Sequence, residues 1–399
     1  MAQSNSLPRI AVLVAVALLV SAPALAAPPI KVAPYGVDAA GCGTGSNLPC
    51  ATIVQAITNA SPGASIAVEP GLYVGNVAVG KRLTLTSTAG STVTIIEGTV
   101  SCDVADIVLG KPGKGFTVAA ADPLVAINAA DVTVRGNILA QGGTGVAIAA
   151  AGTGAEVRDN RIVSCALAID ASAADATIKT NEIAGGNGIA LQSMSAGATV
   201  LDNRITGTDM YGISVMGSDH VVRRNLISGS SGPGIVGGVG TDVQLIENAV
   251  SKSGGIGYYI PFGTGWRLIR NLASGAGFNG FHLEAATTYD LEGNIAIGNA
   301  GDGFFISGGT GHVLVDNTAI GNALNGIAIS ASASVSGGNL YGNGTNCGLT
   351  SPSGQVVSGI FWGAAAGPGL DPADDSCGSA GTDFDPAASP ARIKAPNIK

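Results

Sequence analysis

The chain has 399 residues, of which 61 are Gly, 12% are charged and 4% are aromatic. So few large rings exclude an aromatic core and leave stacked Val, Ile, Leu and Ala as the core material. The formal net charge of −8 argues against a nucleic-acid partner, which would need clustered Lys and Arg, and none is expected.

Residues 1–26 show the pattern of a secretory signal peptide. Arg9 supplies a positive charge, residues 10–20 form an apolar run too short to span a bilayer, and Ala24-Leu25-Ala26 is a small-x-small cleavage site. No later segment reaches the length of a membrane span. We therefore expect an exported protein, located in the periplasm, at the cell surface or outside the cell, with no membrane span.

Residues 27–60 are expected to close one end of the fold. Export permits disulfides, and Cys42 and Cys50 flank a short Gly-containing segment, so we predict that they are bonded. The sequence CATIVQAITNA at 50–60 predicts a short amphipathic helix over the first coil. Its inward-facing residues would be Ile53, Val54 and Ile57.

Residues 61–346 contain an internal repeat of 21 to 23 residues. Ten similar segments share an Asn, and the residue three before it is a branched aliphatic in all but the last segment, where it is Ser336. A Gly-apolar-x-apolar element follows, as in GFHL at 280–283. The shared residues are Asn137, Asn160, Asn181, Asn203, Asn225, Asn248, Asn271, Asn294, Asn317 and Asn339.

Each repeat is interpreted as one coil with three short strands of period-two pattern, separated by Gly and Asn turns. A repeat this short cannot bury its own apolar face, so the coils must stack in register, about 4.8 Å apart. Parallel crossovers turn right-handed, so the fold class is all-β, a single-stranded right-handed parallel β-helix. At each bend, Asn tolerates left-handed backbone geometry, and stacked amides can hydrogen-bond along the ladder. A leucine-rich repeat and a left-handed hexapeptide helix are excluded, because their consensus and period are absent.

Residues 347–399 are predicted to form a C-terminal cap and a loose tail. Cys347 and Cys377 flank the cap and are expected to be bonded. Phe361 and Trp362 could plug the last coil. No cofactor is expected, except that a structural Ca²⁺ could bind near the acidic residues of the cap. These residues are Asp371, Asp374 and Asp375.

Two Cys residues are expected to remain unpaired. Cys102 and Cys165 lie about three coils apart, and coils spaced about 4.8 Å apart would separate them by roughly 14 Å. A disulfide cannot bridge this distance. Both are therefore interpreted as small buried residues.

The opening PCATIVQAI…PGLYVGN…KRLTLT, the Asn-bearing coils and the closing FWG…GPGLDPADD resemble the secreted right-handed β-helix repeat proteins of the pectin-lyase-like superfamily. The resemblance covers roughly residues 40–375. It implies the architecture and not one activity, since this superfamily includes lyases, hydrolases, esterases and surface proteins.

The catalytic motifs of that superfamily are not found in the sequence. Pectate-lyase-like sites require an aligned Asp/Glu cluster that holds Ca²⁺ beside a basic residue, and no such cluster is seen. Of the polygalacturonase-like motifs only Arg392-Ile393-Lys394 matches. Because it lies in the tail, we interpret the match as a coincidence. Pectin-esterase-like motifs and metal-spaced His/Cys groups are also absent. His220 and His312 are interpreted as packing residues.

One outward-facing column stands out in the Gly-apolar-x-apolar strands. Tyr259, His282 and Phe305 occupy the same outward position on consecutive coils, and Glu284 follows on the face of His282. Aromatic faces stack on sugar rings, and His282 with Glu284 could act as an acid/base pair. The alternative is an aromatic ladder that only stabilises adjacent strands. Residues of the adjoining turns that could bind sugar hydroxyls are Asn279 and Asp302.

Two columns of charge accompany the Asn ladder. Alternating signs on four coils predict an exposed ion-pair ladder of modest stabilising effect. A basic column could attract acidic polysaccharide, although a solvated face is the simpler interpretation. The ion-pair ladder comprises Asp202, Arg224, Glu247 and Arg270, and the basic column comprises Arg135, Arg158 and Lys179.

Three hypotheses of function follow. The leading one is a secreted, monomeric protein that presents an elongated surface to polysaccharide or cell-envelope glycan without catalysis. The second is a polysaccharide-degrading enzyme, a lyase or glycoside hydrolase, with His282 and Glu284 as its catalytic pair. The third is a purely structural surface protein. Under the first two, the ligand-binding residues would be Tyr259, Phe305, Asn279 and Asp302.

Overall fold

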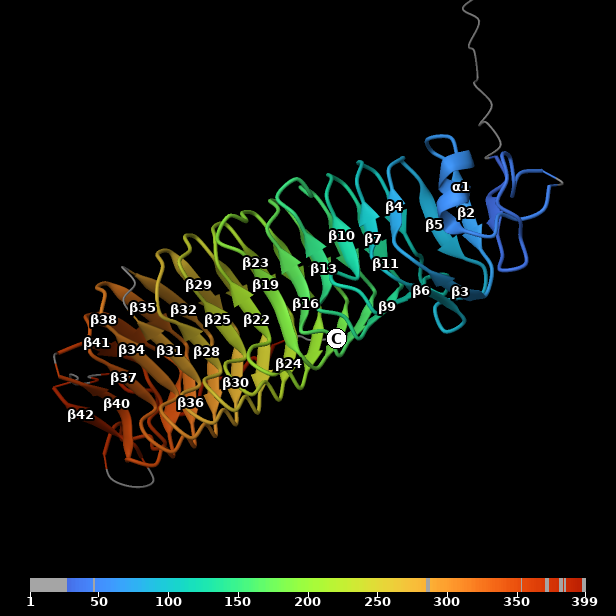
Figure 1. The fold of residues 1–399 in the computed structure, drawn as a ribbon. Helices are drawn as coiled ribbons and strands as arrows, with labels where there is room; N and C mark the ends of the chain where they lie inside the picture. Colours follow the sequence, from blue (N-terminus) through green and yellow to red (C-terminus); the bar gives the residue numbers. More distant parts are fainter. Residues whose placement is uncertain are drawn as a thin grey trace, which may run out of the picture.

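The computed structural model describes residues 27–396 except 46, 285–287, 353, 370–372, 380–382 and 384. The expected signal peptide, residues 1–26, lies outside the described residues. The described residues form an elongated rod of stacked coils with a short helix at one end (Figure 1). Within this part of the chain, no helix is long and apolar enough to cross a membrane.

Each complete coil adds one strand to each of three parallel sheets, which we name A, B and C. Sheet A contains β1 (Ile30–Val32), β2 (Ser65–Val68), β5 (Thr84–Ser87), β8 (Val108–Leu109), β11 (Thr133–Arg135), β14 (Glu156–Arg158), β17 (Thr177–Lys179), β20 (Thr199–Leu201), β23 (Val221–Arg223), β26 (Gln244–Ile246), β29 (Trp266–Ile269), β32 (Tyr289–Glu292), β35 (His312–Val315), β38 (Ala333–Ser336) and β41 (Val356–Ser358). Sheet B contains β3 (Gly71–Val74), β6 (Thr94–Glu97), β9 (Thr117–Ala119), β12 (Ile138–Ala140), β15 (Arg161–Val163), β18 (Glu182–Ala184), β21 (Arg204–Thr206), β24 (Leu226–Ser228), β27 (Ala249–Ser251), β30 (Leu272–Ser274), β33 (Ile295–Ile297), β36 (Thr318–Ile320) and β39 (Asn339–Tyr341). Sheet C contains β4 (Val77–Val79), β7 (Val100–Cys102), β10 (Val125–Ile127), β13 (Thr144–Ile148), β16 (Leu167–Ala171), β19 (Asn187–Leu191), β22 (Ile213–Val215), β25 (Ile235–Gly237), β28 (Tyr258–Ile260), β31 (Phe281–Glu284), β34 (Phe304–Ser307), β37 (Ile327–Ile329), β40 (Cys347–Ser351) and β42 (Asp375–Gly378). The predicted parallel β-helix with three strands per coil is confirmed.

The core is a stack of aliphatic side chains that recur at the same place in successive coils. In sheet A, Val134 pairs with Val157 and Val157 pairs with Ile178, and all three are fully buried. Branched side chains suit the pleated strands, and each fully buried one contributes about 1.5–3 kcal/mol. Stacking in register therefore stabilises the coils and fixes which residues face outward.

The shared Asn residues form a buried amide ladder between sheets A and B. The Asn160 side chain accepts a hydrogen bond from the Asn137 backbone N–H at 3.0 Å and donates to the Val134 carbonyl at 2.9 Å. The pattern continues as far as Asn317, so the predicted amide stacking is confirmed. The left-handed bend, however, lies at the preceding residue, as at Arg270 with a φ of 52°. The buried amide instead completes backbone hydrogen bonds where the chain turns.

The last coil shows why Ser336 breaks the repeat pattern. Asn339 pairs with Thr318, so Gly338 lies at the ladder position of Asn317, and the prediction that Asn339 shares this position is wrong. Val335, three residues before Gly338, pairs with Leu314, takes the inward position and is buried.

A second polar ladder, which the sequence patterns did not predict, lies between sheets B and C. Asn299 donates its side-chain N–H to Asn322 at 2.8 Å, and Asn322 donates to Asn343 at 3.0 Å. The Asp374 carboxylate ends the ladder by accepting from the Asn343 amide at 2.7 Å and from two backbone N–H groups. An acidic residue of the cap therefore closes a hydrogen-bond network.

Helix α1 (Ile53–Asn59) covers the first coil. It begins after Thr52, whose hydroxyl accepts the Gln55 N–H at 3.1 Å. Ile53 and Ile57 are buried as predicted, but Val54 is 50% exposed, so its predicted inward orientation is wrong. One residue along a helix rotates the side chain by about 100°, which carries Val54 off the buried face.

Trp362 closes the other end of the rod. Its ring is fully buried, and its Nε1 donates to the Asp383 carboxylate at 3.1 Å. Phe361 is half-buried and contacts the Tyr341 ring edge-on, with 5.6 Å between ring centroids. Neighbouring residues of extended chain point to opposite faces, so the expected plug is Trp362 alone.

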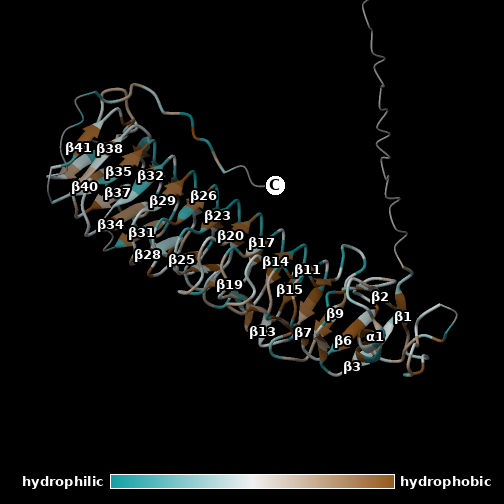
Figure 2. Ribbon diagram, turned by 90° about the horizontal axis from the view of Figure 1, so that it is seen from above, coloured by the Kyte–Doolittle hydropathy of each residue, from teal (hydrophilic) through white to brown (hydrophobic). Residues whose placement is uncertain are grey.

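The chain after Pro386 lies back along the outside of the coils (Figure 2). The Ala387 N–H donates to the Ile360 carbonyl at 3.0 Å. The Asn339 amide exchanges two hydrogen bonds with the backbone of Ala391, at 2.8 and 3.2 Å. The segment expected to be a loose tail is therefore held at two points.

Both predicted disulfides, Cys42–Cys50 and Cys347–Cys377, are present. Cys102 and Cys165 are unpaired and buried, as expected. Burial raises the pKa of the Cys102 thiol to about 12 and also raises the pKa of Cys165. Because the thiolate is the reactive form, both side chains are inert in the folded chain.

We expect a thiol reagent to label neither Cys102 nor Cys165 in the native protein at neutral pH and to label both after denaturation. Spectroscopic counting of reacted thiols measures this. A buried thiol with a raised pKa favours folding below its ordinary pKa of 9.0, and this stabilisation is lost as the pH rises from 9.0 toward about 12. Full labelling of the native protein at neutral pH would contradict the assignment.

Candidate functional site

Sheet C contains a local concentration of aromatic residues. Nine of the 17 Phe, Tyr and Trp residues lie within 258–305. On the inner side, Tyr258, Phe281 and Phe304 are fully buried and stack almost parallel, with 4.5 and 4.6 Å between ring centroids. The expectation of a core without large rings is therefore wrong over these three coils. The stacked rings support a well-packed section of the sheet.

The predicted column of Tyr259, His282 and Phe305 lies on the outer side of the same strands, and we call it the outer column. The three residues are in register on β28, β31 and β34. Ring centroids are 5.4 Å apart for Tyr259–His282 and 4.7 Å apart for His282–Phe305, with planes inclined by 65° and 77°. All three residues are half-buried, so part of each ring is open to solvent.

The His282 imidazole lies beside the Glu284 carboxylate, with 2.7 Å between Nε2 and Oε1. The contact is close, but its angles are not those of a directed hydrogen bond, so the buried Nε2 has no well-aligned partner. The two side chains are 19% and 35% exposed, which leaves both within reach of a ligand. The Tyr289 hydroxyl donates to the Glu284 backbone carbonyl at 2.7 Å and fixes that part of the strand.

Asn279 and Asp302 lie in the turns that precede β31 and β34. Asn279 Nδ2 is 3.4 Å from His282 Nδ1, and Asn279 Oδ1 accepts the Asp302 N–H at 2.8 Å. Asp302 is only 6% exposed, and its carboxylate accepts two hydrogen bonds from Asn325. These residues connect successive turns, and Asn279 is the one in contact with the outer column.

Exposed apolar side chains border the outer column on both sides. Phe278, in the turn before β31, is 64% exposed, and Phe262, just after β28, is 54% exposed. Sequence reasoning missed these residues, although a large apolar residue among Gly and Ser in a turn is a signal that could have revealed them. Contiguous exposed apolar surface is typical of binding sites. Further exposed members on the turns flanking sheet C are Met194, Met210, Met216, Val239 and Leu324.

The predicted ion-pair ladder lies beside the Asn ladder, away from the outer column. Arg224 Nε is 2.7 Å from the Asp202 carboxylate, and Arg270 is 3.1 Å from that of Glu247. These side chains are partly exposed, so each pair contributes about 0–1 kcal/mol.

The predicted basic column is partly neutralised on the outer side of sheet A. Arg158 and Lys179 both pair with Glu156, at 2.9 and 2.7 Å. These two cations therefore already have partners within the protein.

His220 and His312 are buried, as expected of packing residues. In each, Nδ1 accepts a backbone N–H at 3.1 Å, from Ala198 and Tyr289 respectively. Nε2 lies 2.8 and 2.9 Å from a carbonyl of the preceding turn. Burial lowers the pKa of His220. Both residues bridge successive coils through these contacts.

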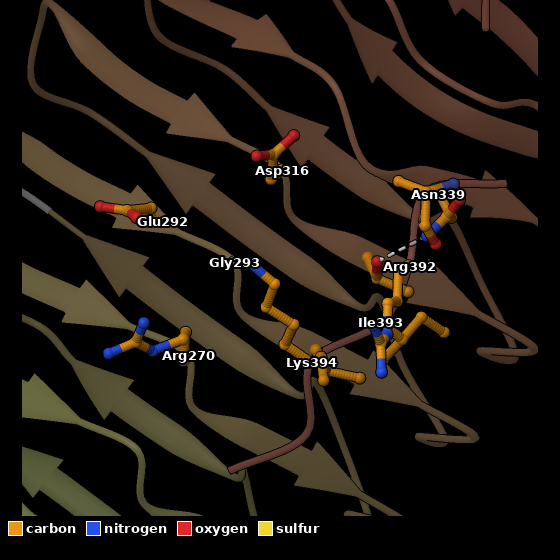
Figure 3. Close-up of a pocket in the computed structure, with 11 residues that line it drawn as sticks. Arg270, Glu292, Gly293, Asp316, Asn339, Arg392, Ile393 and Lys394 are labelled. Carbon is orange, nitrogen blue, oxygen red and sulfur yellow. Dashed lines mark hydrogen bonds between the residues drawn. The ribbon is translucent and has the colours of Figure 1, made fainter.

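The tail borders a shallow cleft over the turns between sheets A and B (Figure 3). Arg392 and Lys394 lie across from Arg270 and Asp316, which come from those turns, and from Glu292 at the end of β32. The residues lining this cleft include no aromatic ring. The Arg-Ile-Lys sequence is therefore placed away from the outer column.

The expected structural Ca²⁺ stays a prediction. Asp371 lies outside the described residues, and the Asp374 carboxylate accepts the hydrogen bonds that end the second polar ladder. Across the described ranges, no group of three or more His, Cys, Asp or Glu is arranged to hold a metal ion.

Three sheets in register, a buried amide ladder and two caps define a parallel β-solenoid, with one aromatic face as its candidate site. The family described as right handed beta helix region matches residues 82–227 and 187–343, and the chain belongs to this family. The resemblance to pectin-lyase-like β-helix proteins is confirmed at the level of the fold. No curated protein matches the sequence.

Two solved structures share the fold. One, a mutant of the periplasmic alginate epimerase AlgG, is similar over 75% of this chain and 76% of its own, with 12% identity and a TM-score of 0.51. The other is the catalytic unit of a thermostable GH87 alpha-1,3-glucanase from Streptomyces thermodiastaticus strain HF3-3. It is similar over 92% of this chain and 71% of its own, with 13% identity and a TM-score of 0.51. At these identities the likeness shows the fold alone.

Proposed function

We propose that this chain binds glycan, of a free polysaccharide or of the cell envelope, at the outer column of sheet C without catalysis. The observation that carries the proposal is a half-exposed aromatic column backed by a buried aromatic stack. Tyr259 and Phe305 lie two coils apart, roughly 10 Å along the axis. The apolar faces of sugar rings pack on such side chains, while nearby polar groups bind the hydroxyls.

Polar groups beside the outer column supply the hydrogen bonds. Burial raises the pKa of Tyr259, and the charge of Glu284 adds to this effect, so the hydroxyl stays protonated and can donate. The Asn279 amide and the Glu284 carboxylate can donate to and accept from sugar hydroxyls. Asp302 holds the turn that carries these groups.

The class of ligand and the location have further support. The two solved structures are, by their titles, an epimerase of alginate and a glucanase, and both act on glycans. Two disulfides and the signal-peptide pattern favour export to an oxidising compartment.

We expect Tyr259→Ala and Phe305→Ala each to weaken the binding of the protein to its polysaccharide by roughly two- to tenfold. The reason is that an aromatic contact is worth about 0.5–1.5 kcal/mol. Affinity electrophoresis against a polysaccharide panel measures this. Tyr341→Ala is the matched control, because Tyr341 is also a half-buried ring in an edge-on aromatic contact, but on sheet B. Equal losses in all three variants would refute the site.

Catalysis is the second candidate, and the 2.7 Å contact between His282 and Glu284 favours it. A half-buried acid/base pair can transfer a proton to a glycan. Incubation with the same panel, scored for new chain ends, separates the two functions. Chain ends that disappear in Glu284→Gln while retention persists would establish an enzyme. If the panel gives neither retention nor new chain ends, the hypothesis of a purely structural β-helix remains.

A further inference from the structure

The charges of the solenoid are divided between its faces. Between residues 98 and 355, the strands of sheet C and the turns that adjoin them contain one cation in the described part of the chain, Lys252. The remaining cations of this range lie on sheets A and B and on the turns between them. They are Lys111, Lys114, Arg135, Arg158, Arg161, Lys179, Arg204, Arg223, Arg224, Arg267 and Arg270.

The carboxylates near the outer column already have partners within the protein. Glu284 is 2.7 Å from His282, and Asp302 accepts two hydrogen bonds from Asn325. Asp170, which lies further along the same outward position, accepts a hydrogen bond from Gln192 at 2.6 Å. None of these three carboxylates therefore requires a cationic ligand as its partner.

An acidic polysaccharide is poorly matched to this surface. Each sugar carboxylate would lose water beside Glu284 or Asp170, and among the described residues the one Lys or Arg near this surface is Lys252, in the turn before β28. Burial of an unpaired charge is costly, and like charges repel. An uncharged sugar ring incurs neither cost and gains the contacts with Tyr259, Phe305 and the exposed rings beside them.

We infer that the ligand of sheet C is an uncharged polysaccharide and that acidic polysaccharides are excluded from this face. The inference rests on the proposed glycan site and adds its charge selectivity. Lysine introduced into the outer column should therefore relax the selectivity.

The experiment measures how strongly the chain from residue 28 onward is retained on glucan, mannan, xylan and galactan. Each polysaccharide is used as an uncharged hydroxyethyl, an anionic carboxymethyl and a cationic quaternary-ammonium derivative. We expect the uncharged form to be retained about tenfold more strongly than the anionic form at low salt, with a smaller difference as salt screens the repulsion. Val236→Lys, one coil before Tyr259 in the outward column, should raise retention of the anionic form. Val313→Lys adds the same charge to the outer side of sheet A and should not.

The outcomes separate this inference from the proposed function. Stronger retention of the anionic or the cationic form, lost in Tyr259→Ala and Phe305→Ala, would overturn the selectivity and leave the glycan site standing. If a derivative is retained equally by the unaltered chain and by both variants, the site itself is overturned. The absence of retention on any of the four polysaccharides would overturn it as well. Stronger retention of the uncharged form that is lost in Tyr259→Ala and Phe305→Ala supports the glycan site. Relaxation of this preference by Val236→Lys and not by Val313→Lys supports the charge selectivity.

Discussion

Asn271→Ala is expected to lower the free energy of unfolding by at least about 2 kcal/mol. The Asn271 side chain accepts from the backbone N–H and the amide of Asn248 and donates to the Leu245 carbonyl, at 2.7–3.0 Å. The Asn248 amide still donates to the Val222 carbonyl after truncation. The Asn248 N–H and the Leu245 carbonyl both lose this partner, and each unsatisfied group costs about 1–3 kcal/mol. Chemical unfolding followed by circular dichroism measures the loss.

Arg270→Gly is the matched control for Asn271→Ala. Arg270 is the adjacent residue, carries the positive φ of the bend and pairs with Glu247 at the surface. Gly accepts positive φ without strain and loses one exposed ion pair, so we expect a change within about 1 kcal/mol. A loss in Asn271→Ala no larger than in this control would show that the amide ladder is dispensable.

Trp362→Ala is expected to cost about 3–5 kcal/mol, the usual effect of truncating a fully buried Trp. The ring lies against Gly348, where an added Cβ would be 2.9 Å from it, and covers the open end of the core. Its removal exposes the last coil to water, so the final strands should fray before the rest of the rod. Hydrogen exchange of the β40 amides, together with the thermal midpoint, measures both effects.

Two variants make the Trp362 result specific. Trp362→Phe keeps much of the packing and loses the hydrogen bond to Asp383, so we expect a smaller loss. Phe361→Ala removes a half-buried ring from the opposite side of the chain and should leave β40 exchange nearly unchanged. Equal acceleration of exchange in Phe361→Ala and Trp362→Ala would contradict the plug.

The repeat made the fold predictable from sequence. A buried position in every coil must satisfy the same packing, so Val134, Val157 and their counterparts recur and fix the register. Outward positions then follow by alternation, which is how the outer column was predicted and why its residues are found in register. The two disulfides were predictable because their Cys residues flank the two ends of the repeat.

Features that depend on local geometry were not predictable in this way. The pattern gave Val54 and Phe361 the orientation of their neighbours. One residue along a helix turns the side chain by about 100°, and one residue along a strand reverses the face, so both predictions were wrong. The left-handed bend was assigned to Asn itself, whereas the amide is needed for hydrogen bonds and the residue before it bends. The exposed rings of Phe262 and Phe278 lie in turns, where no repeat constrains the residue type.

Hydroxyl-radical footprinting with a retained uncharged polysaccharide tests the central claim most directly, because it locates the bound glycan on the chain. We predict that Tyr259, Phe305 and the flanking Phe262 and Phe278 are protected while Tyr341 is oxidised equally with and without glycan. Protection of Tyr341, or of the tail residues over the cleft between sheets A and B, with Tyr259 and Phe305 unchanged, would contradict the assignment of sheet C as the glycan-binding face.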